Sequence, residues 1–138
     1  MNNTMNNVTV AVLERAREIV ANGWTRGANY RLNGRVNEQF GDDCLTLSEA
    51  REVWNDPDQR RRLKCCVSGA MMLAEDTEGE GDDMSGAAIM AAMRKWTGTK
   101  FPMGVVSFND HCDRTQKDIL EILDMAITEA KELFLEDQ

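Results

Sequence analysis

A long amphipathic pattern near residue 120 constrains the fold of this chain more than any other feature. Apolar residues recur there every three or four positions over about five helical turns: Ile119, Leu120, Leu123, Ala126, Ile127, Ala130, Leu133 and Phe134. Acidic residues occupy the opposite side: Glu121, Asp124, Glu129 and Glu132. Thr115 precedes the pattern as a predicted N-cap, and Asp118 lies near the positive end of the helix. The segment is therefore predicted to be a helix that packs one face against a core.

Four further helices are predicted from similar spacing and from capping residues, over residues 8–22, 47–55, 57–75 and 85–98. Gly23 follows the first of them, where a left-handed C-terminal cap is expected. Thr46 and Glu49 form a capping-box pattern before the second. Asp56-Pro57 is typical of an N-cap followed by proline at the first helical position, and so predicts where the third begins.

The predicted helix over residues 57–75 carries apolar or small residues on two sides. On a helical wheel, one side holds Leu63, Cys66, Val67, Ala70, Leu73 and Ala74, and the other holds Cys65, Gly69 and Met72. A helix that is apolar on two faces is typical of the middle of a bundle. We therefore expect it to be central, with Gly69 and Ala70 allowing a neighbour to approach closely.

One small β-hairpin is expected over residues 30–37. Asn33-Gly34 is the strongest two-residue signal for a hairpin turn, and Tyr30–Leu32 and Arg35–Asn37 flank it. The predicted fold is mainly α: an irregular bundle of about five helices with this hairpin, in one domain over residues 1–138. Residues 1–7 are expected to be disordered, and residues 75–84 to form an acidic loop.

The charge of the chain limits the classes of partner. With a net charge of −8, the chain gains little from counterion release, so direct nucleic-acid binding is not expected. No stretch approaches the roughly 18–20 apolar residues that cross a membrane, and no signal peptide is recognised. Four cysteines without a disulfide-like spacing are typical of reduced thiols, which predicts a cytoplasmic location.

A cysteine nucleophile is the first candidate for catalysis. Cys65 or Cys66, with His111 as base and Asp110 as orienting residue, would supply the required groups. Against this, the wheel places Cys66 in the core stripe, where thiols behave as inert apolar groups. A metal site built from these cysteines with His111 and Cys112 lacks the usual ligand spacing, and an EF-hand-like reading of residues 76–87 lacks its final glutamate. No metal and no cofactor is therefore expected.

A repeated phrase suggests a polar cleft. Trp54-Asn55-Asp56 is followed by Arg60, and Phe108-Asn109-Asp110 is followed by Arg114 at the same offset from the aromatic residue. One interpretation is a ligand-binding cleft that contains Trp24, Asn109, Asp110 and Arg114. The simpler interpretation is that each phrase only forms the entry to a helix, with the aromatic residue packing on the turn.

Three short phrases resemble a family of uncharacterised small proteins found in bacteriophages and actinobacteria. They are Gly23-Trp24-Thr25-Arg26-Gly27, Cys66-Val67-Ser68-Gly69-Ala70, and Phe108-Asn109-Asp110 followed by Arg114-Thr115 and Asp118-Ile119-Leu120. The chain departs from the family at Cys65, where an aromatic residue is more common, and at Phe108, where tryptophan is. The resemblance implies a phage or prophage setting and carries no known activity.

These observations favour a binding protein rather than an enzyme. We expect a phage-type accessory protein that acts by binding a host or phage protein, such as a component of a host defence system. The alternative is a small-ligand-binding protein or a cysteine-dependent enzyme with a cleft near Cys65, Asp110 and His111. The sequence does not indicate the oligomeric state.

Overall fold

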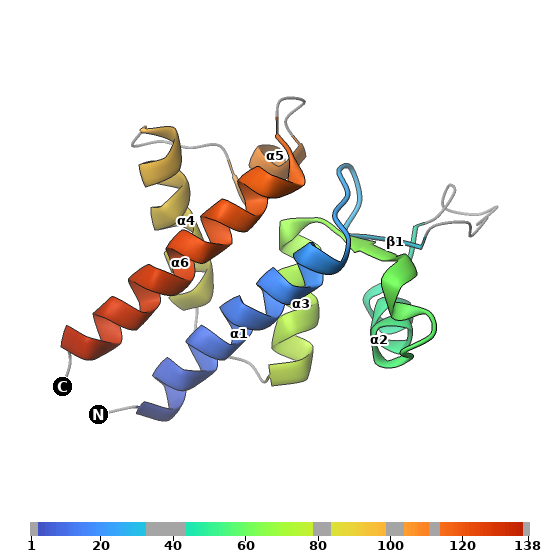
Figure 1. Ribbon diagram of the computed structural model, residues 1–138, viewed down its shortest axis with the longest axis horizontal. Helices are drawn as coiled ribbons and strands as arrows, with labels where there is room; N and C mark the ends of the chain where they lie inside the picture. Colours follow the sequence, from blue (N-terminus) through green and yellow to red (C-terminus); the bar gives the residue numbers. More distant parts are fainter. Residues whose placement is uncertain (1–2, 33–43, 79–83, 99–103, 111–113, 137–138) are drawn as a thin grey trace.

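The computed structural model describes residues 3–32, 44–78, 84–98, 104–110 and 114–136 (Figure 1). Within these residues, the chain forms six α-helices and one two-stranded antiparallel sheet. In chain order the elements are α1 (Asn3–Asn22), β1 (Tyr30–Leu32), α2 (Leu47–Asn55), the 3₁₀ turn η1 (Arg60–Arg62), β2 (Leu63–Cys65), α3 (Val67–Glu78), α4 (Met84–Thr97), α5 (Val105–Asp110) and α6 (Gln116–Glu136). The predicted mainly α class with one small sheet is confirmed.

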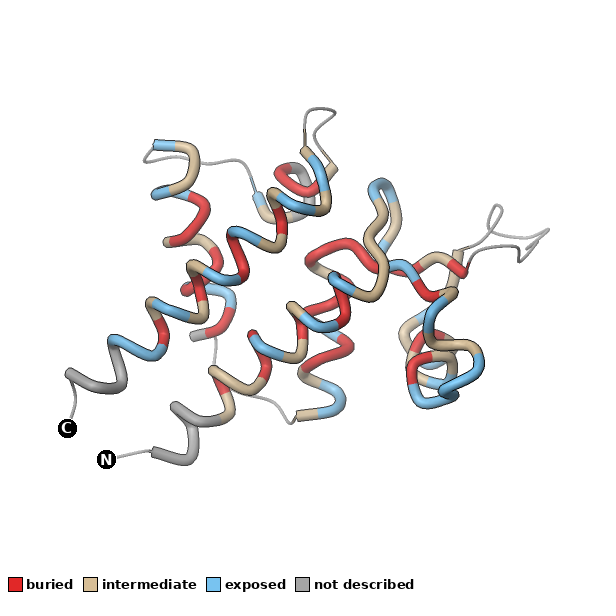
Figure 2. Tube along the Cα trace, viewed as in Figure 1, coloured by how far each residue is buried: buried red, intermediate tan, exposed pale blue. Residues whose placement is uncertain are grey.

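Helix α1 lies between α6 and α3, and α4 packs on α6 (Figure 1). Five α1 side chains at helical spacing are fully buried: Val12, Leu13, Ala16, Ile19 and Val20. Figure 2 shows the buried sides of α1 and α6 as repeating stripes along each helix. The α6 stripe lies slightly to one side of the predicted one, because Ile122 is buried while Leu120 and Ile127 are only half-buried.

The predicted helix caps at Thr46 and Thr115 are both present. The hydroxyl of Thr46 accepts from the backbone N–H of Glu49 at 3.2 Å, and the Glu49 carboxylate accepts from the N–H of Thr46 at 3.1 Å. Thr115 and Asp118 exchange the same two bonds, at 3.2 and 3.1 Å. These reciprocal bonds satisfy N–H groups that a helix start leaves unpaired, and so fix where α2 and α6 begin.

The prediction of one helix over residues 57–75 is wrong. Asp56 ends α2, and the chain then passes through a turn, η1 and β2 before α3 begins at Val67. Leu63 and Cys65 are buried on either side of exposed Lys64, which is the alternation of a strand. The helical wheel had separated these two apolar residues onto opposite faces. Pairing with β1 buries both on one side, and this tertiary contact overrides the helical spacing.

The central position predicted for this segment is taken by α1 instead, because α1 packs against both α6 and α3, and Met72 on the second predicted apolar side of α3 is exposed. Helix α3 packs on α1, and its residues Val67, Gly69, Ala70, Leu73 and Ala74 are buried. A Cβ atom added to Gly69 would lie 2.3 Å from the carbonyl oxygen of Asn29. The predicted close approach of a neighbour therefore occurs at Gly69.

The partner of the predicted first hairpin strand comes from elsewhere in the chain. Strand β1 pairs with β2 in the register Tyr30↔Cys65, Arg31↔Lys64 and Leu32↔Leu63. The predicted turn at Asn33-Gly34 and second strand over residues 35–37 lie outside the described residues. Arg31 also forms a bridge with Cys44 on the other edge of β1.

Several helix boundaries differ from those predicted. Helix α1 begins at Asn3, so residues 3–7 of the segment expected to be disordered are helical. Helix α3 continues to Glu78 and α4 begins at Met84, so the expected acidic loop over 75–84 is partly helical, and residues 79–83 lie outside the described part. Among the described helices, none combines the length and the hydropathy needed to span a bilayer.

Candidate functional site

The predicted polar cleft is centred on Asn109, in the short helix α5. Its side-chain oxygen accepts from the indole N–H of Trp24 at 2.8 Å and from the backbone N–H of Val67 at 3.0 Å. Its amide nitrogen donates to the carbonyl of Thr25 and to the carboxylate of Asp110, both at 3.0 Å. Asn109 has no exposed surface. It thus joins the loop after α1, the start of α3 and the end of α5.

These four bonds use the whole hydrogen-bonding capacity of the Asn109 side chain. An amide oxygen has two lone pairs and an amide nitrogen has two N–H groups, and each has a protein partner here. A ligand could bond to Asn109 only by displacing one of these partners. Asn109 therefore has a structural role, in which its side chain holds neighbouring segments together.

Asp110 fixes the C-terminal end of the loop over residues 23–27. Its carboxylate accepts from the backbone N–H of Gly27 at 2.9 Å. Gly27 has a φ of 77°, which glycine adopts without the steric cost that a side chain would add. Gly23, at the start of the loop, lies so close to β2 that an added Cβ would be 2.4 Å from the carbonyl oxygen of Leu63. The phrase Gly-Trp-Thr-Arg-Gly therefore has a clear structural role.

Arg114 is held mainly by aromatic rings. Its guanidinium carbon lies 4.0 Å from the ring centroid of Phe108 and 4.9 Å from that of Trp96. The two rings meet edge to face, with centroids 5.6 Å apart. The Arg114 carbonyl accepts a bond from the guanidinium of Arg26, whose carbon lies 5.1 Å from the Trp24 ring centroid. Trp24 and Arg114 were predicted to belong to this cleft, whereas Trp96 and Arg26 were not.

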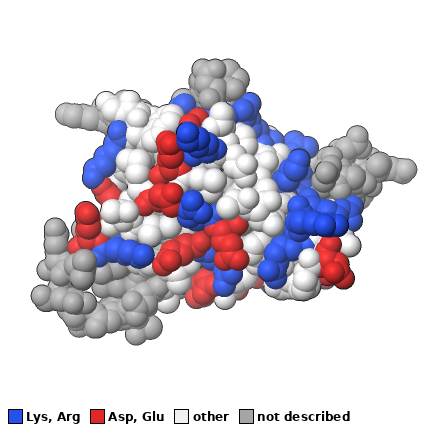
Figure 3. All heavy atoms as spheres, in the orientation of Figure 1, with Lys and Arg blue, Asp and Glu red and all other residues white. Residues whose placement is uncertain are grey.

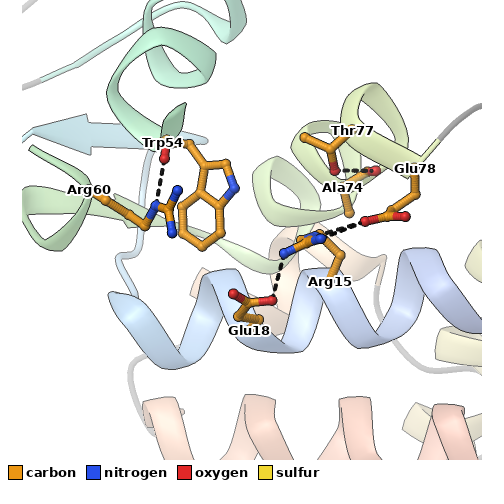
Figure 4. Close-up of polar contacts among 7 residues, drawn as sticks. All are labelled: Arg15, Glu18, Trp54, Arg60, Ala74, Thr77 and Glu78. Atoms are coloured by element: carbon orange, nitrogen blue, oxygen red, sulfur yellow. Dashed lines mark hydrogen bonds and ion pairs between the residues drawn. The ribbon is translucent and has the colours of Figure 1, made fainter. Parts of the chain in front are cut away.

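The repeated phrase forms the same contact twice. Arg60 stacks on Trp54 at 4.7 Å and donates its Nε to the Trp54 carbonyl at 2.6 Å (Figure 4), and Arg114 stacks on Phe108. Both phrases lie at the end of a helix, α2 or α5. The prediction that they form helix entries is therefore wrong. In each case the arginine folds back over the aromatic residue that precedes it, as cation–π attraction favours.

The candidate thiols lie inside the protein. Cys65 has no exposed surface and Cys66 is 2% exposed, as the core assignment of Cys66 predicted. The Cys66 thiol donates to the side-chain oxygen of Asn29 and accepts from the N–H of Gly69, both at 3.3 Å. Burial raises the pKa of both thiols, so the reactive thiolate is disfavoured. His111, the proposed base, lies outside the described residues.

The metal sites considered from the sequence are only partly covered by the structure. In the described ranges, no group of three His, Cys, Asp or Glu side chains could hold an ion. His111, Cys112 and residues 79–83 of the calcium-like segment lie outside those ranges.

A model of a family of unknown function matches residues 5–129, from the first turns of α1 to the last part of α6. The chain belongs to this family, DUF6197. The three phrases that suggested a resemblance all lie within the match. No curated protein and no solved structure matches the chain.

This DUF6197 chain also has an open groove that sequence reasoning did not locate. It lies between α3 and α4 beside the start of α5, and its volume is about 540 Å³. Its lining is mostly apolar: Ser68, Met71, Met72, Glu75, Ser85, Gly86, Ala87, Ile89, Met90 and Val105. We call it the α3–α4 groove. The position of Met72 could have indicated this groove, because the helical wheel placed this apolar residue away from the main core stripe.

Proposed function

We propose that this protein is a phage-type accessory protein that acts by binding another protein through the α3–α4 groove. The observation that supports this most directly is the exposure of methionine in an open apolar groove. The phage setting, with a host protein or defence system as partner, is supported by the three phrases of the resemblance. The family itself carries no activity that could be transferred.

The lining of the groove suits a protein ligand. Met72 is 36% exposed, and it is the only large apolar side chain classed as exposed in the described part of the chain. Met90 is half-buried beside it in the same groove. Methionine side chains are flexible and polarisable, so they adapt to the surface of a partner. A groove between two helices accepts the apolar face of a third, with anchors every three or four residues.

Charge indicates the kind of helix that would bind. Glu75 lines the groove, and the sequence from residue 75 to 83 contains six acidic residues and no basic one, although Asp76 and Glu78 also form ion pairs with Arg51 and Arg15. The chain as a whole carries −8. An amphipathic helix with lysine or arginine beside its apolar face would therefore be attracted and correctly oriented. We infer that the partner presents such a basic amphipathic helix.

The alternative function, a small-ligand-binding protein or a cysteine-dependent enzyme near Cys65, has less support. The Cys65 and Cys66 thiols are buried, and the polar groups around Asn109 bond to one another. The groove, by contrast, is open, and its lining is mostly apolar.

A model peptide tests the groove directly. The peptide is an amphipathic helix with leucine at every third or fourth position and lysine at the positions beside them. It should bind the purified protein, and isothermal calorimetry measures its affinity. Met72→Gln and Met90→Gln should each weaken binding roughly ten-fold, which corresponds to about 1.4 kcal/mol for the loss of an apolar anchor. Met125→Gln is the matched control, because Met125 is half-buried on α6 and lines a separate, acidic pocket; an unchanged affinity is expected and would exclude binding there.

Two results would overturn the proposal. One is equal binding by wild type, Met72→Gln and Met125→Gln. The other is equal binding of a leucine–glutamate peptide with the same spacing, because it would show that charge complementarity plays no part. A photo-crosslinker at position 72 can then identify the natural partner in infected cells, with the same crosslinker at position 125 as control.

A further inference from the structure

The exposed side of the two-stranded sheet carries two like charges in direct opposition. Arg31 of β1 and Lys64 of β2 are partners in the antiparallel register. Their neighbours Tyr30, Leu32, Leu63 and Cys65 are buried, so Arg31 and Lys64 share the outward side. Like charges placed directly opposite each other destabilise an antiparallel pair. A local arrangement that costs stability is often retained for function.

A third cation extends this side of the sheet. The Nη2 of Arg31 donates weakly to the carbonyl of Arg26 at 3.4 Å, and Arg26 is itself exposed, although its guanidinium also bonds the Arg114 carbonyl. The aliphatic part of Lys64 lies over Gly23, at the start of the same loop. We call Arg26, Arg31 and Lys64 the cationic face. Figure 3 shows basic side chains gathered at the end of the molecule that holds β1 and α2, whereas acidic side chains lie mostly over the helical half.

The described acidic residues do not neutralise this face. Arg15, Arg17, Arg51 and Lys95 form ion pairs with described carboxylates, and none of them belongs to the cationic face. The nearby carboxylate of Asp110 already accepts from the backbone of Gly27 and from Asn109. The cationic face is therefore a concentration of positive charge in a chain whose net charge is −8.

We propose that the cationic face binds an acidic segment of a partner protein. Arg26 and Arg31 each donate to one main-chain carbonyl and keep further N–H groups that can bond a carboxylate, and Lys64 adds a third donor. The strands of the sheet have three residues each, a length of about 10 Å, which matches a few extended residues of a partner. A long nucleic acid fits less well, because it would also meet the acidic remainder of the surface. This surface is separate from the α3–α4 groove and does not depend on it.

A labelled hexaglutamate peptide is the probe for this surface. Fluorescence anisotropy should show binding at low salt that weakens as salt is added. Lys64→Gln and Arg31→Gln should each weaken binding several-fold, and the double variant should weaken it by at least about ten-fold. Lys64→Arg keeps the charge and should retain binding. Arg94→Gln, an exposed change of the same charge on α4, is the matched control.

Thermal melting of the same variants separates binding from folding. Lys64→Gln should melt at the same temperature as wild type or higher, because it removes a repulsion. The proposal is overturned if hexaglutamate does not bind, or if Arg94→Gln weakens binding as much as Lys64→Gln. It is also overturned if a short single-stranded DNA or inorganic phosphate competes at concentrations below those of the peptide. None of these results bears on the binding of the leucine–lysine peptide to the groove.

Discussion

The indole N–H of Trp24 and the backbone N–H of Val67 donate to the same oxygen atom of Asn109, at 2.8 and 3.0 Å. One buried amide thus joins the loop after α1 to the first residue of α3. Because the other two bonds of Asn109 go to Thr25 and Asp110, its loss would leave several buried groups without a partner.

The first prediction concerns this amide. Asn109→Ala should lower the free energy of unfolding by about 2–4 kcal/mol, because it leaves the N–H groups of Trp24 and Val67 without acceptors. Urea unfolding followed by tryptophan fluorescence measures this change. Asn55→Ala is the matched control from the other copy of the phrase. Asn55 is exposed, so its replacement should change stability by less than about 0.5 kcal/mol.

The second prediction concerns the contact between α3 and the loop before β1. Gly69→Ala should destabilise the protein by about 3 kcal/mol or more, because the new Cβ would overlap the Asn29 backbone. Gly86→Ala is the control, since nothing lies within 4 Å of its added Cβ. That change in α4 should stabilise the protein by up to about 1 kcal/mol. A similar loss in both variants would contradict the packing described here.

The third prediction concerns the arginine that stacks at the end of α2. Arg60→Ala should cost about 1–2 kcal/mol, because it removes both the stacking on Trp54 and the bond to the Trp54 carbonyl. Thermal melting measures this, and the tryptophan emission should shift to the red as Trp54 gains contact with water. The neighbouring exposed residue supplies the control, and Arg61→Ala should leave both measurements close to wild type.

The fourth prediction concerns the buried thiols. In the native protein at neutral pH, iodoacetamide should modify Cys65 and Cys66 at least about a hundred-fold more slowly than free cysteine, because both thiols are buried and neutral. Peptide mass mapping over time measures the two rates. Partial denaturation in urea should remove the protection. Modification of Cys66 in folded protein at the rate of free cysteine would restore the case for a nucleophile.

The fifth prediction concerns alkaline pH. Burial raises the pKa of Cys65, Cys66 and Tyr30 in the folded protein. Above about pH 8.5 the unfolded chain loses thiol protons that the folded chain keeps. Stability is therefore complete below this pH, and it should fall above it by up to about 1.4 kcal/mol per pH unit for each group.

Urea unfolding between about pH 8 and 10 tests this dependence. Cys65→Ala should show a shallower fall than wild type because one of the responsible groups is removed. Leu73→Ala is a control that destabilises the core without removing a titrating group, and its slope should match that of wild type. Equal slopes for Cys65→Ala and wild type would mean that this thiol ionises freely in the folded state.

Local signals in the sequence were sufficient for most of the fold. The caps at Thr46 and Thr115 and the stripes of α1 and α6 depend on residues a few positions apart; the structure confirms the caps and the α1 stripe, and the α6 stripe is only slightly displaced. The segment from Pro57 to Val67 was predicted wrongly, because its conformation depends on pairing with residues some thirty positions earlier. Single-sequence spacing contains no information on that partner.

The candidate site shows the same division. Trp24, Asn109 and Asp110 were named together from their residue types, and the structure brings them into one network. The contribution of the Val67 backbone could not be predicted, because a main-chain N–H leaves no mark in the sequence. The α3–α4 groove was missed because it depends on how two successive helices and the start of α5 pack in space, which the spacing within one helix does not indicate.

The neighbouring positions of α1 and α6 have a consequence for synthesis of the chain in the cell. The apolar stripe of α1 is made first, yet one of the helices that cover it is the last described element to be made. During translation the nascent chain must therefore carry Leu13 and Ile19 incompletely covered until residue 116 and those after it have left the ribosome. Apolar surface that is exposed in this way favours aggregation until the core can close.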